Sequence, residues 1–515
     1  MKTEWCFLLF CVLIQAGDGD DPAGNQVVDF RDRTPGPIGI MTTSLGAPIN
    51  HRQASGTLNK RLIFHDFFMD QVLRLNRERI PPRVVHAKGG GAFGYFEVTH
   101  DMRDICKAKL FNNVGKKTPI AVRFSLVLQE VGGIDTSRDV RGFSVKFYTE
   151  DGNFDIVGLN TPVFIIKDPL FFPTFARSGK RNPQTFLYDS NMLWDFLVLR
   201  PETMHNQVRI FSDLGIPDGY RHMPGFGVHT FQLVNEENEK YFIRFHFTPD
   251  AGVKNLKSSE AQKIAGYDPD YANRDLFNAI GTGHFPSWTV SIQVLSVSDV
   301  KNADFDVFDV TRVLPEDKYP LRPVGKLVLN KNPVNYFAEI EQLAFCPGNL
   351  VPGILGSPDK QFEARRLSYR DAQNYRLGGN FKNIGVNKAI REPLTYNRDG
   401  EPPIGENERN VPNYYPNSYN GPVPYFEENE VDLIEIYESP AVNLDQTREF
   451  YEHMTIDEKA RLIENILYSL GSVTDPLLKE RSVKLLRAIN PQLGNRVLEG
   501  LIANRTEYFW NKEFK

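Results

Sequence analysis

The chain has 515 residues, a formal net charge of −5 and a pI near 6.1. This composition excludes a small disulfide-stapled domain, and without a basic block it predicts no nucleic-acid partner. Beyond the N-terminus no apolar run reaches membrane-spanning length, so no membrane partner is expected either. The 37 Phe and 20 Tyr, against 4 Trp, supply flat apolar surface for a large core or for an apolar planar ligand.

The N-terminus is typical of a secretory signal. Lys2 gives a weakly positive start, Trp5 to Ile14 is an unbroken apolar run too short to span a bilayer, and Ala16-Gly17 supplies small residues for cleavage. We therefore predict that residues 1–17 are a cleaved signal peptide and that the protein is secreted to the extracellular space. A buried N-terminal helix is the alternative that this pattern leaves open.

The cysteines and one N-glycosylation sequon also bear on whether the protein is secreted. Two of the four cysteines lie in the predicted signal, and the remaining pair, Cys106 and Cys346, forms neither a disulfide framework nor a zinc-binding set. A chain of this length can be stable on its core alone. The N-glycosylation sequon Asn504-Arg-Thr gives weak support to secretion.

The next segment, residues 18–76, is predicted to form an N-terminal arm that ends in a helix. Residues 18 to about 60 are polar, with Gly, Pro and Asn and little periodicity, as in an extended segment. Leu62 to Leu75 carries apolar residues at helical spacing, which predicts a short helix.

Residues 77–330 are predicted to form a β-rich domain, either a barrel or a sandwich. Charged Arg123, Lys146 and Arg244 alternate with apolar neighbours, which is the period of two of a half-buried strand. Helices are expected near Met192–Leu199 and Ser259–Ile264. The candidate strands are Ile120–Ser125, Gly142–Tyr148, Phe154–Gly158, Val163–Ile166, Thr230–Val234, Tyr241–Phe247 and Trp288–Leu295.

The last third of the chain divides into two parts. Residues 331–440 are irregular and rich in Pro, Asn and Gly, and their interspersed Tyr and Phe favour a segment that wraps over a folded body. One helix, Gln361 to about Asn374, is predicted inside it. Residues 441–515 are predicted to form a helical domain, because apolar residues recur at helical spacing from Glu449 to Leu470 and again beyond Leu477.

Two motifs could carry chemistry. Arg365 and Tyr369 are four residues apart and share a helix face, where the guanidinium would favour a phenolate, a hard anionic ligand suited to ferric iron. In Arg83-Val-Val-His86, a neutral imidazole beside a bound peroxide could move a proton from one oxygen to the other, and Ser125 could fix its tautomer. Taken alone, each motif has a plainer interpretation: an Arg/Tyr pair on a helix surface, a histidine buried in a strand, and surface arginines.

Further stretches accompany these motifs in a fixed order from about residue 77 to 380. Among them are Arg77-Glu-Arg-Ile-Pro, Thr118-Pro-Ile-Ala-Val-Arg-Phe-Ser, Arg141-Gly-Phe-Ser-Val-Lys-Phe-Tyr-Thr-Glu-Asp-Gly-Asn, Lys180-Arg-Asn-Pro-Gln-Thr and Pro323-Val-Gly-Lys-Leu-Val-Leu-Asn. Together they resemble haem catalases of the small-subunit kind. The resemblance implies an α+β fold with an eight-stranded antiparallel β-barrel, an N-terminal arm, a wrapping segment and a C-terminal helical domain. It also implies a homotetramer that decomposes hydrogen peroxide to water and oxygen with haem b and its iron.

The resemblance assigns residues to the two sides of the haem. His86 would be the distal catalytic histidine with Ser125 as its hydroxyl partner. Tyr369 would be the proximal iron ligand, and Arg365 the arginine that keeps it ionised. The other expected haem-binding residues are Arg83, Arg123 and Arg376 at the propionates, Val85, and Phe172, which would stack on the distal side of the porphyrin.

One departure from the family pattern concerns the distal side. Val157-Gly-Leu159-Asn160-Thr-Pro stands where the family has Val-Gly-Asn-Asn-Thr-Pro, so the amide that helps to orient peroxide is missing. Asn160 is not expected to replace it, because neighbouring strand residues point to opposite faces. Two alternatives therefore stay open beside the catalase: a haem peroxidase acting on organic hydroperoxides, and a haem-binding remnant of low activity.

A second departure concerns NADPH, which some family members bind. His205 and Ser212 match that site, but Leu214, Thr248 and Leu314 stand where the NADPH binders carry Arg, Lys and Trp. We therefore predict no tight NADPH binding.

Overall fold

The computed structural model describes residues 21–50, 66–403, 405–426, 433 and 442–513. Two compact units divide the chain: Met1–Pro81 with Phe277–His284, and Pro82–Leu276 with Phe285–Lys515. The predicted signal peptide lies outside the described residues, and the sequon at Asn504 lies outside those whose side chains are described. In the described ranges no helix is both long and apolar enough to cross a membrane. The five-part division predicted from the sequence stays a prediction.

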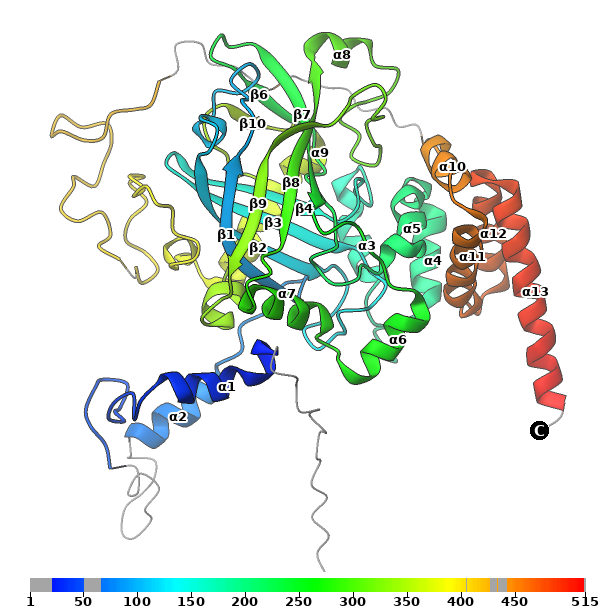
Figure 1. The fold of residues 1–515 in the computed structure, drawn as a ribbon, viewed down its shortest axis with the longest axis horizontal. Coiled ribbons are helices and arrows are strands. Elements are labelled where there is room, and N and C mark those ends of the chain that lie inside the picture. Colours follow the sequence, from blue (N-terminus) through cyan, green and yellow to red (C-terminus); the bar gives the residue numbers. More distant parts are fainter. Residues whose placement is uncertain (1–20, 51–65, 404, 427–432, 434–441, 514–515) are drawn as a thin grey trace, which may run out of the picture. The chain divides into compact units, whose positions relative to one another are not determined.

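The smaller unit contains α1 (Pro22–Arg33) and α2 (Asp66–Asn76) (Figure 1). α2 matches the helix predicted near its position, but α1 shows that the expected extended arm is wrong over residues 22–33. The carboxylate of Asp21 caps α1 by accepting from the Gly24 N–H at 3.1 Å, and Pro22 occupies the first turn, where its missing N–H costs nothing. This cap and proline start the helix despite its polar composition.

A closed antiparallel β-barrel is the main element of the larger unit (Figure 1). Eight strands close a ring in the order β7-β5-β4-β3-β2-β1-β9-β8, with β8 pairing back to β7. β6 (Phe231–Val234) and β10 (Ile354–Gly356) extend the sheet beyond β7. This confirms the eight-stranded barrel and the α+β class. The ring strands are β1 (Gly89–Val98), β2 (Lys117–Leu126), β3 (Arg141–Thr149), β4 (Gly152–Leu159), β5 (Gly225–Phe226), β7 (Lys240–Pro249), β8 (Ser287–Ser296) and β9 (Arg322–Lys331).

Aromatic side chains fill the inside of the barrel. Phe143 meets Phe124 edge to face and stacks with Phe247, each with ring centroids 5.0 Å apart. Trp288 lies 5.5 Å from Phe143, and all four side chains are buried. Much of the phenylalanine content is therefore core, and the outer face of the same strands is available for a site.

The structure differs from the predicted strands in two ways: one predicted strand is absent, and some strands of the ring were not predicted. Val163–Ile166 is a buried irregular segment rather than a strand, and the Phe164 N–H donates to the Val310 carbonyl at 2.7 Å. A short apolar run does not by itself distinguish a strand from such a segment. Three ring strands, β1, β5 and β9, were not among the predicted strands. Three glycines at the start of β1 hide its pattern, and β5 has only two residues.

Helices of the larger unit pack beside the barrel and form a C-terminal bundle. α9 (Lys360–Leu377) is the helix predicted within residues 331–440, and Asp359 caps it by accepting from the Phe362 N–H at 2.8 Å. The bundle consists of α10 (Asp445–Glu452), α11 (Ile456–Gly471), α12 (Pro476–Ile489) and α13 (Pro491–Glu513), and it packs on α4 and α5. The remaining helices are α3 (Phe172–Ser178), α4 (Ser190–Leu199), α5 (Met204–Phe211), α6 (Ser258–Tyr267), α7 (Tyr271–Gly281) and α8 (Val297–Asn302).

Candidate active site

Three adjacent strands bring candidate residues together on the outer face of the barrel. Ser125 of β2 pairs with Gly142 of β3, which pairs in turn with Leu159 of β4. Directly paired residues project to the same face, and so do residues two positions along each strand. The next row on this face consists of Arg123, Ser144 and Val157.

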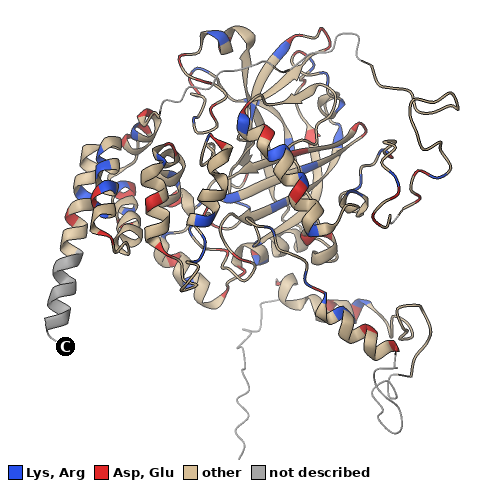
Figure 2. Cartoon of the chain, turned by 180° about the vertical axis from the view of Figure 1, so that it is seen from behind, with Lys and Arg blue, Asp and Glu red and all other residues tan. Residues whose placement is uncertain are grey.

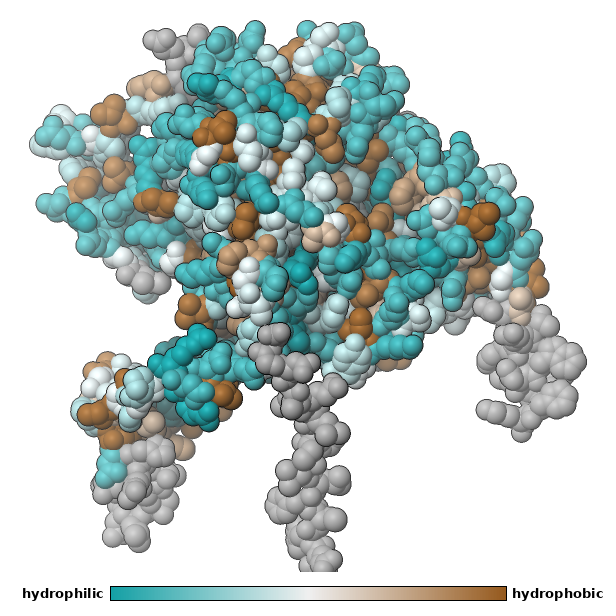
Figure 3. All heavy atoms as spheres, in the orientation of Figure 1, coloured by the Kyte–Doolittle hydropathy of each residue, from teal (hydrophilic) through white to brown (hydrophobic). Residues whose placement is uncertain are grey.

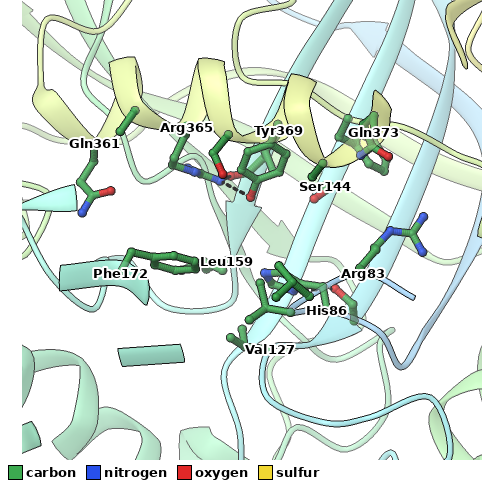
Figure 4. Close-up of a pocket in the computed structure, with 18 of the residues that line it drawn as sticks. Arg83, His86, Val127, Ser144, Leu159, Phe172, Gln361, Arg365, Tyr369 and Gln373 are labelled. Atoms are coloured by element: carbon green, nitrogen blue, oxygen red, sulfur yellow. Dashed lines mark hydrogen bonds between the residues drawn. The ribbon is translucent and has the colours of Figure 1, made fainter. Parts of the chain in front are cut away.

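A cavity of about 350 Å³ lies between this face and α9 (Figure 4). Its two walls carry different chemistry. The α9 wall presents polar side chains, and the opposite wall is mostly apolar around one imidazole. The labelled α9 residues are Gln361, Arg365, Tyr369 and Gln373, and those of the opposite wall are His86, Val127, Leu159 and Phe172.

His86 lies on the apolar wall, just before β1 rather than in a strand. Its backbone has a φ of 66°, a left-handed conformation that side chains seldom adopt, and its N–H donates to the Val127 carbonyl at 2.9 Å. Its Nδ1 is 2.9 Å from the Ser125 hydroxyl oxygen. Burial, helped by the positive charges of Arg123 and nearby arginines, lowers the pKa of His86 to about 3. The imidazole is therefore neutral near pH 7.

Tyr369 lies on the α9 wall, at the end of a chain of polar contacts. Arg365 donates to the Tyr369 hydroxyl oxygen at 3.0 Å and to the Val157 carbonyl at 2.8 Å. The same guanidinium lies 2.8 Å from His229 Nε2, and His229 Nδ1 lies 2.8 Å from the Asp359 carboxylate. These contacts hold the guanidinium where it would stabilise a phenolate. Sequence reasoning missed His229 and Asp359; only the capping position of Asp359 before α9 offered a signal.

Three guanidinium groups meet at one edge of the cavity. Arg376 Nη1 is 2.9 Å from Glu341 Oε1, whereas Arg83 is 3.4 Å from the same oxygen and also donates to three carbonyls of the 340–343 turn. The Arg83 guanidinium is therefore already engaged by contacts within the chain. The Nε atoms of Arg123 and Arg376 are buried without a partner among the described residues. Three guanidinium charges against one carboxylate leave two positive charges to be matched.

The remaining predicted residues have separate positions. Val85 and Phe172 line the cavity, and the Phe172 ring stacks on Phe164 with centroids 6.3 Å apart. Leu159 lines the cavity and is buried. Asn160 is not among the lining residues, because its side-chain oxygen accepts from the Arg141 N–H at 2.8 Å.

The positions compared with an NADPH site lie on α5 and beyond. His205 Nδ1 is 2.8 Å from the Thr311 carbonyl and its Nε2 is 3.2 Å from the Arg209 guanidinium. That guanidinium lies 4.2 Å from the Phe450 ring centroid. Both ring nitrogens of His205 are thus used within the chain.

The cavity fits a planar, apolar, dianionic metal macrocycle. A phenol and an imidazole face each other across it, and two unmatched positive charges lie at one edge. The fold and this site define a class of protein: an antiparallel barrel with a cavity on its outer face whose lining fits a planar, anionic metal macrocycle.

Comparison with known proteins gives the family. The family model described as Catalase matches residues 42–421, and one described as Catalase-related immune-responsive matches residues 438–501. Catalase of Mus musculus is 47% identical over 494 residues, which cover 93% of each chain. Catalase of Drosophila melanogaster is 46% identical and covers 95% of this chain and 100% of its own. The chain belongs to the catalase family and is an enzyme of that type.

Solved structures agree with the match. A fungal catalase superposes with a TM-score of 0.85 at 37% identity, over 90% of this chain and 97% of that one. Catalase A of Saccharomyces cerevisiae gives 0.83 at 39% identity, over 90% and 99%.

Proposed function

We propose that the chain decomposes hydrogen peroxide to water and oxygen with a haem b held in this cavity. The observation that carries the proposal is the opposition of the His86 imidazole and the Tyr369 phenol across the cavity, with three arginines at one edge. The family match to catalases supports it.

The chain's own residues suit the two faces and the edge of a haem. Tyr369 would hold the iron, and Arg365 would stabilise its phenolate form. Arg83, Arg123 and Arg376 would pair with the two propionates, and Val85 and Phe172 would pack on the porphyrin. When bound, the haem supplies two-electron redox chemistry that side chains cannot provide.

His86 moves the proton. Because its Nδ1 is engaged by Ser125, Nε2 is the ring nitrogen available to a peroxide in the cavity. In its neutral form it takes a proton from one peroxide oxygen and returns it to the other, so that the O–O bond breaks unevenly. Over a cycle one peroxide is reduced to water and a second is oxidised, so two H₂O₂ give two H₂O and one O₂.

The test is oxygen evolution per haem in the purified holoprotein. His86→Ala is expected to keep the Soret band and lose oxygen evolution, whereas Tyr369→Phe is expected to change the iron ligation and the Soret band. Exposed residues away from the cavity supply the controls: Tyr468→Phe on α11 and His100→Ala on the surface should change neither. A full haem complement without oxygen evolution would refute the function.

Secretion and a homotetramer complete the proposal. The N-terminal sequence supports a secreted, extracellular protein, which is tested by N-terminal sequencing of the protein recovered from the medium of expressing cells. Exposed apolar side chains support assembly, for example Leu45 at 98% and Val423 at 89% exposure, and Figure 3 shows others on the surface. Light scattering should give four times the chain mass. Interspersed charges of both signs are consistent with the absence of a nucleic-acid partner (Figure 2).

A further inference from the structure

The wall around His86 is one continuous apolar cluster. Val127, Leu159, Phe164 and Ile165 belong to a single group of buried side chains, and Val85 and Phe172 pack against that group. All six line the cavity. The Ser125 hydroxyl is already engaged by His86. A peroxide on this side therefore meets one available imidazole nitrogen and otherwise hydrocarbon.

Leu159 is the wall side chain best placed to determine whether a second polar group lies beside His86. It lies in the same row as Ser125, separated from it only by Gly142, which has no side chain. A Cβ on Gly142 would lie 2.9 Å from His86 Nδ1, so the imidazole fills the space above this glycine. The next side chain along the row is Leu159, which lines the same cavity as His86.

We propose that Leu159 makes this cavity a site for organic hydroperoxides, with the alkyl group of the substrate packed against Leu159, Val127 and Phe164, the part of the wall that the porphyrin contacts of Val85 and Phe172 leave open. The proposal rests on the haem function proposed above. In the reaction ROOH + H₂O₂ → ROH + H₂O + O₂, the O–O bond of the hydroperoxide breaks and accepts two electrons. Hydrogen peroxide supplies those electrons and is oxidised to O₂. His86 takes the proton of the hydroperoxide and returns it to the alkoxide oxygen, which leaves as the alcohol.

Two energetic effects favour this substrate class. Each buried methylene contributes enough to raise affinity about fourfold, so binding should improve with chain length until the cavity is full. A small, fully polar peroxide gains nothing from that wall, and the lack of a second hydrogen-bond donor costs it about 10- to 1,000-fold in rate by analogy with oxyanion-hole donors. The balance therefore moves toward substrates that carry hydrocarbon.

The first experiment measures binding rather than turnover. Methanol, ethanol, propanol and butanol, which are products of the proposed reaction, compete with cyanide in the ferric holoprotein, and the Soret shift reports occupancy. The dissociation constant is expected to fall about fourfold per added carbon in the wild type. In Leu159→Asn this dependence should flatten, and Leu159→Ile, which keeps the wall apolar, should retain it.

The second experiment measures turnover with ethyl and tert-butyl hydroperoxide, alone and with hydrogen peroxide. The wild type should release alcohol together with O₂ in the mixed reaction, approaching one alcohol per O₂ as the organic hydroperoxide is made the larger share. Leu159→Asn should lose organic turnover while gaining tenfold or more in oxygen evolution from hydrogen peroxide alone. Alcohol affinity independent of chain length, or unchanged substrate preference in Leu159→Asn, would overturn the role of Leu159. Loss of all peroxide consumption in a haem-replete wild type would instead overturn the proposed function.

Discussion

A single methyl group at Gly142 should disable the site. A Cβ there would lie 2.5 Å from the Ser125 hydroxyl oxygen and 2.9 Å from His86 Nδ1, whereas ordinary contacts begin near 3.4 Å. Gly142→Ala must therefore displace the hydroxyl by about 0.9 Å, which breaks its 2.9 Å contact with His86. A displacement of about 1 Å at a catalytic group typically costs about 100-fold in rate. Overpacking of this kind costs about 1–3 kcal/mol of folding free energy.

The assay is oxygen evolution per haem, with the Soret band as a check on haem content. Gly132→Ala is the matched control, because a Cβ at Gly132 meets nothing within 4 Å. Ser125→Ala removes the atom of the tightest contact, so adding Gly142→Ala to it should cost much less than about 100-fold. Additive losses in the double variant, or full activity in Gly142→Ala, would refute the geometry.

Three further predictions test other contacts. Asp155→Asn should lower the free energy of unfolding by about 3–5 kcal/mol, because it leaves the Lys146 ammonium, which is 1% exposed, buried without its carboxylate. Asp304→Asn, in the exposed Lys318–Asp304 pair, should lower it by less than about 1 kcal/mol. Urea unfolding measures both values, and similar losses in the two variants would contradict the burial argument. Arg365→Met should lower the haem-to-protein ratio, because it removes the hydrogen-bond partner of Tyr369 and His229. Arg366→Met, at the neighbouring position, should leave the ratio unchanged. Equal haem loss in both variants would argue against a role of Arg365 in holding the haem. Burial, helped by Arg209, lowers the pKa of His205 to about 3, so the unfolded state binds a proton that the folded state refuses as the pH falls below about 6.5. His205 should therefore lower the free energy of unfolding by about 2 kcal/mol between pH 7 and pH 5. In His205→Gln the free energy of unfolding should depend less steeply on pH over this range. An unchanged dependence would show that His205 is protonated in the folded state.

The strands that carry the site could be predicted from local pattern. The period of two in β2 and β3 put Arg123 and Lys146 on one face and phenylalanines on the other, and the structure has that arrangement. The helical spacing of Arg365 and Tyr369 likewise predicted their contact on α9. Arg365 and Tyr369 are four residues apart, so helix geometry alone brings them together, whereas the shared face of Arg123 and Lys146 also requires the register between β2 and β3.

Other features had no local signature. The apolar run Val163–Ile166 was expected to be a strand. Its side chains are buried without any strand pairing, and the Phe164 N–H donates instead to the Val310 carbonyl in another loop. The Arg83 guanidinium donates to the carbonyls of Ile340 and Leu343, more than 250 residues away, and no local pattern indicates these contacts. The contact between the Arg365 guanidinium and His229 also had no local signature, because the two residues are 136 positions apart in the chain.

The sequence by itself determined a β-rich domain and the α9 motif, because periodicity and spacing are local properties. The choice of a barrel over a sandwich, and the pairing of His86 with Tyr369 across a haem, came from the resemblance to haem catalases. Only the tertiary structure decided that the Tyr369 phenol and the His86 imidazole stand on opposite walls of one cavity. It also placed Leu159 two strands from Ser125, across a glycine whose missing side chain leaves room for His86. These relations depend on strand register and on the packing of α9 over the barrel, which are set by contacts between residues far apart in the chain.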